Sequence, residues 1–384
     1  MGFINVDSLI DLKKGLLKAI EDKLSDRERR EALTDSHVRR KPRPCGLTIH
    51  TSIGCALQCR YCYIYDMGFK AAFTSYPLSG LQLAYTLLNN PYFIPTVHGT
   101  YLAIGSISEP FHPAVKDKTF EYIESFYNLL GNPTQFSTKY YISRIEAENL
   151  SEISGKKISP LVTIVTLEKS RELEPYAPSP DKRLESVKNL REAGLKPFIF
   201  IRPIIPGVTD LEYKTIIDKA REYGAVGVVA GTLRVTRRIL RGLRELNIDV
   251  KEVEKRLEVP VEKMREGVQY EIYTGDIKRE IQKYAVKNGL MFFPSSCMAN
   301  LYTHGLVCWR MVEYGVIDKE LTRPDRVEIT TFLEKHGYSP EFVDVKDTSI
   351  VVELKRRRCD TVLLHEILLH RYKMCPRIKY AIKT

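Results

Sequence analysis

Residues 47–63 read LTIHTSIGCALQCRYCY, a short apolar run followed by a glycine and three closely spaced cysteines. The apolar start predicts a strand over residues 47–51, and Cys55, Cys59 and Cys62 have the spacing CxxxCxxC. Zinc sites with four cysteines usually combine two close pairs, whereas this is an uneven trio. Three thiolates on one loop suit three corners of a cubane iron–sulfur cluster and leave the fourth iron without a protein ligand. The stretch therefore predicts a 4Fe–4S cluster held by these three cysteines.

Short apolar runs alternate with helical stretches beyond this loop. Strands are expected at residues 47–51, 101–105, 135–138, 161–166, 198–204 and 226–230. Helices are expected between them, at residues 78–89, 119–130, 144–153, 181–193 and 211–223. Strands that alternate with helices are typical of parallel βαβ units. The sequence thus predicts an α/β fold, a partial (β/α)6 barrel of six parallel strands, over residues 45–245.

Two further regions flank the predicted barrel. Residues 1–44 are expected to form an N-terminal helical extension, with a helix over residues 1–30, and a basic linker that ends in RRKPRP. Residues 246–384 are expected to form a mainly helical, basic C-terminal domain that contains the remaining cysteines. The prolines of the linker predict extended chain before the barrel begins.

The composition is that of a folded protein, because 43% of the residues are hydrophobic. No run of 18 or more apolar residues occurs, so no membrane span is expected, and the start lacks a signal peptide, so a cytoplasmic protein is expected. Abundant charge and only five Gln residues are typical of a thermophile. The net charge is +11, with many basic residues near the C-terminus. This excess predicts an anionic partner, nucleic acid or acidic lipid, or else a solvated tail.

The three cysteines are also consistent with two other kinds of site. A zinc site could be completed by Cys45 or His50, and buried structural thiols would need no metal. The position of the trio directly after the first predicted strand favours the cluster, because barrel enzymes keep their active sites at the C-terminal ends of their strands.

The cysteine motif resembles that of the radical S-adenosylmethionine (SAM) superfamily. Other segments are similar to its branch related to spore photoproduct lyase, and these are YLAIGSISEPFHP at 101–113, STK at 137–139, EPYAP at 174–178, REAG at 191–194 and RPIIPG at 202–207. The resemblance extends over about residues 40–244. Photoproduct lyases carry a hydrogen-donating cysteine at the end of the second strand, where this chain has Gly105. That departure argues against repair of thymine dimers.

The resemblance implies a cofactor, a partner and two residue roles. The open iron would bind the amino and carboxylate groups of SAM, and a reductant protein would supply an electron to the cluster. Cleavage of SAM would give methionine and a 5′-deoxyadenosyl radical that abstracts hydrogen from the substrate. Tyr61, just before the third cysteine, would pack against the adenine, and Lys139 would pair with the carboxylate of SAM.

Polar residues at other strand ends are further candidates for cofactor binding. Ser106 follows the second predicted strand, Thr166 closes the fourth and Arg202 lies on the fifth. A charge flanked by apolar strand residues needs a partner, which favours Lys139 and Arg202 over the two hydroxyls. Each of these side chains could also make an ordinary hydrogen bond within a loop or the barrel.

A second group of cysteines lies in the C-terminal region and comprises Cys297, Cys308, Cys359 and Cys375. Four thiols could hold a second iron–sulfur cluster or a zinc ion. Their spacing lacks a CxxC pair, so unpaired buried thiols or a disulfide of the kind found in thermophiles are equally consistent with it.

Together these patterns predict a radical SAM enzyme whose substrate is nucleic acid or nucleotide-like. A peptide or lipid substrate would use the same machinery. A non-catalytic, zinc-stabilised nucleic-acid-binding protein is the alternative of a different class, with the ligands Cys45, Cys55, Cys59 and Cys62. Five arginines share one face of an expected helix and could follow a phosphate backbone, namely Arg234, Arg237, Arg238, Arg241 and Arg244.

Overall fold

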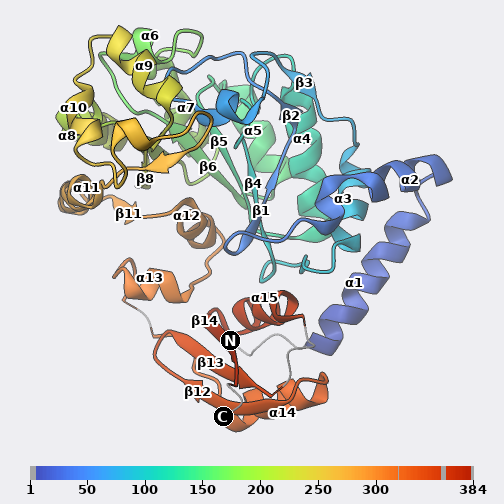
Figure 1. Cartoon of the computed structure of the whole chain (residues 1–384). Helices are drawn as coiled ribbons and strands as arrows, with labels where there is room; N and C mark the ends of the chain where they lie inside the picture. Colours follow the sequence, from blue (N-terminus) through green and yellow to red (C-terminus); the bar gives the residue numbers. More distant parts are fainter. Residues whose placement is uncertain (1–5, 319, 356–359, 382–384) are drawn as a thin grey trace.

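The computed structural model describes residues 6–318, 320–355 and 360–381 (Figure 1). Its centre is a seven-stranded sheet in the order β1-β4-β5-β6-β7-β8-β11, and every neighbouring pair in it is parallel. The strands are β1 (Gly46–Ile49), β4 (Tyr101–Ile104), β5 (Thr134–Thr138), β6 (Ile158–Thr163), β7 (Phe198–Ile204), β8 (Gly227–Thr232) and β11 (Met291–Phe293). The α/β partial barrel is thus confirmed, and its six predicted strands are all present.

The seventh strand, β11, was not predicted. It has three residues and pairs with β8, so Met291 lies opposite Gly227. A run of three apolar residues is too short to distinguish from the end of a helix by periodicity alone. Strand β11 lies in the part of the chain that the sequence assigned to the C-terminal region.

Helices cover the outer face of the sheet. They are α3 (Gly80–Asn89), α4 (Lys116–Ser125), α5 (Arg144–Ile153), α7 (Pro180–Glu192), α8 (Thr209–Glu222) and α11 (Gly275–Lys287), with the π-helical turn η3 (Phe126–Leu130) after α4. Along β7, Ile199 and Ile201 join the apolar core under these helices, whereas Phe198 and Phe200 join a second core on the inner face. The alternation follows from the two-residue period of a strand.

The segment after β8 covers one end of the barrel with short elements. These are β9 (Arg234–Val235), α9 (Arg237–Glu245), α10 (Val250–Glu254), the 3-10 turn η4 (Val261–Lys263) and β10 (Tyr270–Glu271), which pairs with β9. They share an apolar core with the loop that carries Cys59 and Tyr61, and with the short helix α6 (Ser170–Leu173) through Leu173.

The C-terminal region contains helices α12 (Ser296–Thr303), α13 (Trp309–Glu313), α14 (Arg326–Lys335) and α15 (Thr361–Tyr372). It also contains a three-stranded sheet that the sequence analysis did not predict, formed by β12 (Pro340–Val345), β13 (Ser349–Leu354) and β14 (Cys375–Tyr380). This sheet packs with α14 and α15 around its own apolar core, as the lower part of Figure 1 shows. Helix α12 contacts the inner face of the barrel, where Met298 packs with Phe198 and Leu161.

The N-terminal extension forms two helices rather than the single expected one. Helix α1 (Val6–Glu21) ends before Ser25, which begins α2 (Asp26–Thr34) with a capping box to Glu28. A capping box satisfies free backbone N–H groups at a helix start, so it favours a new helix at this position. A 3-10 turn, η1 (Ser36–Arg39), then leads to the barrel. None of the described helices is both long and apolar enough to cross a membrane.

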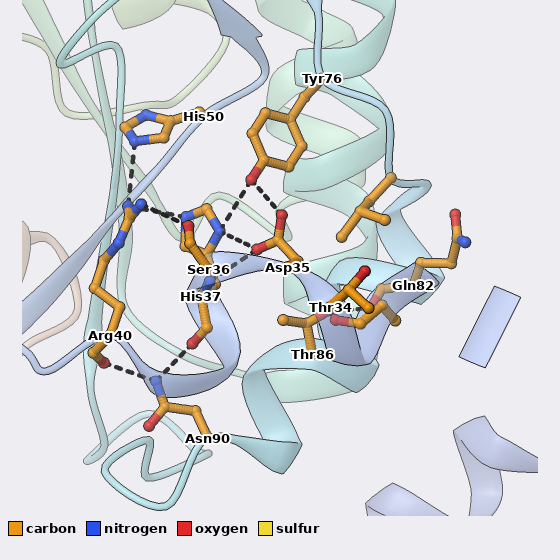
Figure 2. Close-up of polar contacts among 12 residues, drawn as sticks. Thr34, Asp35, Ser36, His37, Arg40, His50, Tyr76, Gln82, Thr86 and Asn90 are labelled. Atoms are coloured by element: carbon orange, nitrogen blue, oxygen red, sulfur yellow. Dashed lines mark hydrogen bonds and ion pairs between the residues drawn. The ribbon is translucent and has the colours of Figure 1, made fainter. Parts of the chain in front are cut away.

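A polar cluster ties this extension to the edge of the sheet (Figure 2). Nδ1 of the buried His37 lies 2.7 Å from Asp35 Oδ1, and the Tyr76 hydroxyl donates to the other oxygen of Asp35 at 2.5 Å. Arg40 Nη1 lies 3.2 Å from Nε2 of both His37 and His50. Burial acts to raise the pKa of Asp35, but the bonds from His37 and Tyr76 outweigh it and hold the pKa at about 2.

We predict that Asp35→Asn lowers the free energy of unfolding at pH 7 by about 2 kcal/mol, because hydrogen bonds to a charged group are lost. The folded pKa of Asp35 is below its unfolded value, so its contribution is complete above about pH 4 and is lost as the pH falls toward 2. Urea unfolding at several pH values measures both effects. Asp181→Asn is the control, because its carboxylate is 73% exposed and should contribute within about 0.5 kcal/mol. Equal losses for the two variants would contradict the prediction.

Candidate functional site

The three cysteines of the motif lie on a loop beyond the C-terminal end of β1. The loop begins after the short strand β2 (Ser52–Ile53) and ends at the 3-10 turn η2 (Tyr63–Met67). The strand β3 (Thr74–Ser75) follows this turn and pairs with β2. Backbone hydrogen bonds hold this cysteine loop (residues 54–62) to its surroundings, including Cys55 N to Lys70 O at 3.2 Å. Gly54 has a φ of +80°, and a Cβ there would lie 2.4 Å from Ala72 O. Only glycine fits this approach, which fixes where the loop leaves the strand.

Side chains hold the loop from a second direction. The Tyr65 hydroxyl donates to Cys55 O at 2.9 Å, and Arg238 donates to Cys62 O. Arg238 also forms an ion pair with the largely buried Asp66 at 2.7 Å, and its guanidinium lies over the Tyr65 ring. Helix α9 therefore contributes one arginine of the predicted stripe to anchoring the cysteine loop. Sequence analysis missed Tyr65 and Asp66, although both directly follow the cysteine motif.

The surroundings of the three thiols favour a positively charged ligand. Burial raises the pKa of Cys55 to about 11 and also raises the pKa values of Cys59 and Cys62. The negative charge of neighbouring thiolates raises the pKa values of Cys55 and Cys59 further, whereas the charge of Lys139 lowers the pKa values of all three. Buried thiolates are costly unless cations such as iron offset their charge, so the donor set fits a cluster that binds through thiolates.

Among the described residues, no three Cys, His, Asp or Glu side chains are arranged to hold one metal ion. The ligands of a cubane bind three different irons, so a cluster does not require such an arrangement.

The proposed alternative zinc ligands lie elsewhere. Cys45 precedes β1 at its opposite end, where it is buried in an apolar core, and Arg40 Nη1 lies 3.2 Å from His50 Nε2. Strand β1 alone spans about 13 Å, at about 3.3 Å per residue, between Cys45 and the start of the hairpin. The set Cys45, Cys55, Cys59 and Cys62 is therefore not assembled, because the two ends of one strand cannot meet.

Tyr61 is held by a buried network that the sequence analysis did not identify. Its hydroxyl donates to Glu174, which forms an ion pair with Arg183 at 2.5 Å. Arg183 also donates to Thr163 O at 3.1 Å and to Pro178 O at 2.8 Å. The side chains of Glu174 and Arg183 are both completely buried. The EPYAP segment contained one of these residues, but nothing in the sequence connected it to Arg183 on α7.

Lys139 lies beside this network, directly after β5. Its Nζ is 5.6 Å from the centre of the Tyr61 ring. Burial acts to lower its pKa, but the negative charges of Cys59 and Glu174 outweigh this and raise it, so the ammonium stays protonated. No carboxylate in the described part of the chain forms an ion pair with it, which leaves the ammonium available to an anionic ligand.

The position of Lys139 is set by Glu109. This buried carboxylate accepts hydrogen bonds from Lys139 N at 2.7 Å, from Thr138 Oγ1 at 2.5 Å and from Phe111 N at 3.1 Å. Burial raises the pKa of Glu109 despite these bonds. Glu109 therefore joins the loops that follow β4 and β5.

The other three predicted cofactor residues have different surroundings. Thr166 is buried and donates to Glu212 of α8 at 2.6 Å, so it closes the turn after β6. Arg202 is exposed on the inner face of β7 and lies over the Phe200 ring. Ser106 Oγ is buried, and none of the described residues forms a hydrogen bond with it. Thus the structure brings Tyr61 and Lys139 to the cysteines, whereas neither Thr166 nor Arg202 forms a hydrogen bond or ion pair with the cysteine loop over the described ranges.

The backbone explains why glycine occupies position 105. Its φ is +95°, and a Cβ at this position would lie 2.3 Å from Ser137 O. A cysteine at position 105 would require the neighbouring strand end to move, so the departure from photoproduct lyases is built into the backbone here.

The second group of cysteines is only partly assembled. Cys297 and Cys308 lie near each other and near Cys45, while Cys359 lies outside the described residues. The charges that act on Cys375, at the start of β14, come from Arg377, Glu313 and Arg310. A second cluster or zinc site therefore stays a prediction.

Every arginine of the predicted stripe has an intramolecular partner. Arg238 pairs with Asp66, and Arg237 donates to Glu262 O at 2.9 Å. The other three form ion pairs, namely Arg234 with Glu271, Arg241 with Glu266 and Arg244 with Glu254. This pairing reduces the positive field that a phosphate backbone would meet.

Known proteins are similar to the chain in sequence and in fold. No model of a known protein family matches the chain. An uncharacterized protein of Methanocaldococcus jannaschii is 27% identical over 168 residues, which cover 43% of this chain and 62% of that protein. The match thus spans less than two thirds of that relative.

Two solved structures of spore photoproduct lyase variants are similar to the chain. One, a mutant in which serine replaces a single cysteine, has a TM-score of 0.53 at 18% identity and covers 67% of this chain and 77% of its own. The other, a double mutant with bound AdoMet and dinucleoside spore photoproduct, has a TM-score of 0.53 at 17% identity and covers 71% and 84%. At this identity the likeness establishes the fold. The chain therefore shares the fold of these spore photoproduct lyase structures.

Proposed function

We propose that this protein is a radical SAM enzyme whose cluster is held by Cys55, Cys59 and Cys62. The observation that carries the proposal is the meeting of three thiols, one buried and two half-buried, with Lys139 at the C-terminal ends of the barrel strands. Its ammonium forms no ion pair with any described residue. Parallel barrels place their active sites at this end. When bound, the cluster would supply the electron that cleaves SAM to give a 5′-deoxyadenosyl radical.

The residues around the loop have distinct roles in this proposal. Lys139 binds the carboxylate of SAM, and the Tyr61 ring packs against the adenine. Glu174 and Arg183 are positioning residues, because they hold the Tyr61 hydroxyl from outside the site. Val165, Leu173 and Leu233 belong to the apolar core around the loop and exclude water from it. Exclusion of water protects a reactive radical from side reactions.

The inner face of the barrel supports a polar, anionic substrate. Gln135 and Ser159 lie opposite each other on β5 and β6, and their side-chain oxygens are buried with no hydrogen-bond partner among the described residues. Such groups normally pair with water or a ligand. The exposed guanidinium of Arg202 lies on the same face and has no carboxylate partner in the described ranges. We therefore propose a nucleic acid or nucleotide-like substrate, and a cytosolic reductant protein as the electron source.

A peptide carrying acidic groups is the second candidate substrate, because Arg202 would bind a carboxylate as well as a phosphate. A lipid would leave Gln135 and Ser159 without partners, which disfavours it.

We expect Cys59→Ala to abolish the brown colour of anaerobically purified protein and the formation of 5′-deoxyadenosine from SAM, because a cluster held by two thiolates is not retained. Visible absorbance, iron and sulfide counts and product analysis measure these losses. The control is Cys45→Ala, which removes a buried thiol at the opposite end of β1 and should leave both signals unchanged. Colourless native protein with stoichiometric zinc would refute the proposal, and about eight irons per chain instead of about four would reveal a second cluster.

Lys139→Met should weaken SAM binding by about 10- to 100-fold, because a charge-assisted interaction with the carboxylate contributes about 1.5–3 kcal/mol. Calorimetric titration of the cluster-loaded protein measures the affinity, and the iron content checks that the cluster is retained. Lys116→Met is the matched control, because Lys116 is paired with Glu146 on the outer layer. An unchanged affinity in Lys139→Met would remove this residue from the SAM site.

Arg202→Met should reduce the affinity for a short single-stranded oligonucleotide several-fold, because a phosphate loses its cationic partner. Fluorescence anisotropy at fixed salt measures the binding. Arg241→Met serves as the comparison, because this equally charged residue of the stripe is already paired with Glu266. A larger effect in Arg241→Met would locate nucleic acid on helix α9 instead of in the barrel, and binding of an acidic peptide alone would favour the second candidate.

A further inference from the structure

A cavity of about 380 Å³ lies at the amino end of the barrel, away from the cysteine loop. Its walls come from helix α1, from the π-helical turn η3 and from the loops that precede β4, β5 and β6. Thr134, at the start of β5, lines the cavity, whereas Lys139 follows the other end of the same strand, about 17 Å away at about 3.3 Å per residue. A volume of this size is typical of pockets that bind small molecules. The cavity is therefore distinct from the candidate SAM site.

Part of the cavity wall is apolar and is held in place by helix α1. Leu12 and Leu16 are four positions apart on this helix, so they share the face that lines the cavity. The turn η3 contributes two further leucines. Lys13 fixes the helix, because its ammonium donates to Asn90 O at 2.6 Å and to Phe93 O at 2.7 Å. The apolar wall thus has a defined position before any ligand binds.

The lining also contains an amide oxygen without a partner. Asn132 is 4% exposed, and its Nδ2 donates to Ile94 O and to Thr100 O, at 2.8 Å in each case. Both N–H groups of the side chain are therefore used, which identifies the remaining atom as the oxygen. Asn132 Oδ1 is buried and forms no hydrogen bond with any described residue. Because buried acceptors normally pair with water or a ligand, a molecule in the cavity should offer this oxygen an N–H or O–H donor.

The charge of the lining favours an anion. Lys157 lines the cavity just before β6, is exposed, and forms no ion pair within the described ranges. None of the residues that line the cavity is an aspartate or a glutamate. An ammonium without a carboxylate in the same lining suits a negatively charged group, with which it forms a charge-assisted hydrogen bond. Tyr127 beside it is 39% exposed, so such a group would keep contact with water at the mouth of the cavity.

The backbone of the cavity wall has an unusual conformation at one residue. Thr96 has a φ of +88°, a region that a β-branched residue rarely occupies. Its N–H donates to Leu130 O at 2.9 Å, so the loop before β4 is joined to η3 within the wall. Strained residues and π-helical turns are both frequent at functional sites. The local geometry therefore agrees with a binding role for this lining.

We propose that this cavity binds a small amphipathic acid. The apolar body of the acid lies against the leucines of α1 and η3, its N–H or O–H group donates to Asn132 Oδ1, and its carboxylate pairs with Lys157. The bound acid joins α1 to the barrel, because both contribute to the same lining. This site does not depend on the radical chemistry proposed for the cysteine loop.

Indole-3-acetate combines an apolar ring, one N–H donor and a carboxylate, and it serves as the probe. Calorimetric titration of the anaerobic, cluster-loaded chain should show saturable binding at a single site. The midpoint of thermal unfolding should rise at saturating probe, because the ligand binds only the folded chain. Naphthalene-1-acetate lacks the N–H group and should bind about five-fold more weakly, because the buried oxygen stays unpaired. Tryptamine carries an ammonium in place of the carboxylate and should bind about 10-fold more weakly.

Variants test the same contacts from the side of the protein. Lys157→Met should weaken the binding of indole-3-acetate about 10-fold, and Leu16→Trp should block it because the larger side chain fills the cavity. Lys188→Met on the outer helix α7 is the matched control and should leave the affinity unchanged. Absence of binding to the wild-type chain, equal affinity for either analogue, or unchanged affinity in Leu16→Trp would overturn the proposal. The analogues decide the question even where a variant fails to fold.

Discussion

The candidate site depends on the buried ion pair between Glu174 and Arg183. Both side chains are fully removed from solvent, a cost that only the pair and its hydrogen bonds offset. One oxygen of Glu174 faces Arg183, and the other accepts from the hydroxyl of Tyr61, which lies between Cys59 and Cys62 in the sequence. Breaking such a pair typically costs about 3–5 kcal/mol, so the carboxylate that accepts from the Tyr61 hydroxyl is held firmly in place.

Parallel topology explains how residues from distant segments reach this point. The cysteine loop follows β1, Glu109 follows β4 and Lys139 follows β5, and all three strands end at the same edge of one sheet. The anchors belong to helices, because Arg238 is on α9 over the end of the barrel and Arg183 is on α7 on its outer face. The cysteine loop is therefore held by residues from several elements, although no regular element contains its thiols.

The sequence predicted the features that depend on local patterns. The six strand positions follow from short apolar runs, and the three cysteines and Lys139 are recognisable from spacing and from their place after strands. What it missed depends on contacts between distant residues. No local sequence pattern near Arg183 indicates that Glu174 is its partner. The spacing of the five arginines in the stripe likewise does not predict that each pairs with an acidic side chain or a backbone carbonyl. Strand β11 and the sheet β12–β14 were missed because their short or mixed patterns do not separate strand from helix.

Strand β1 separates two kinds of cysteine chemistry that the sequence presents as one dense cluster. Cys45 and Cys55 are ten positions apart, yet the strand and the β2–β3 hairpin direct them to opposite ends of the barrel. At one end, burial disfavours every thiolate, so a cation-rich group is needed to stabilise them. At the other end, Cys45 and Cys308 are buried in an apolar core, and Cys297 packs against it. Strand β1 keeps the two sets apart, because the cysteine loop cannot reach Cys45 while the strand stays extended. The extended geometry of one short strand thus decides which of these thiols can share a site.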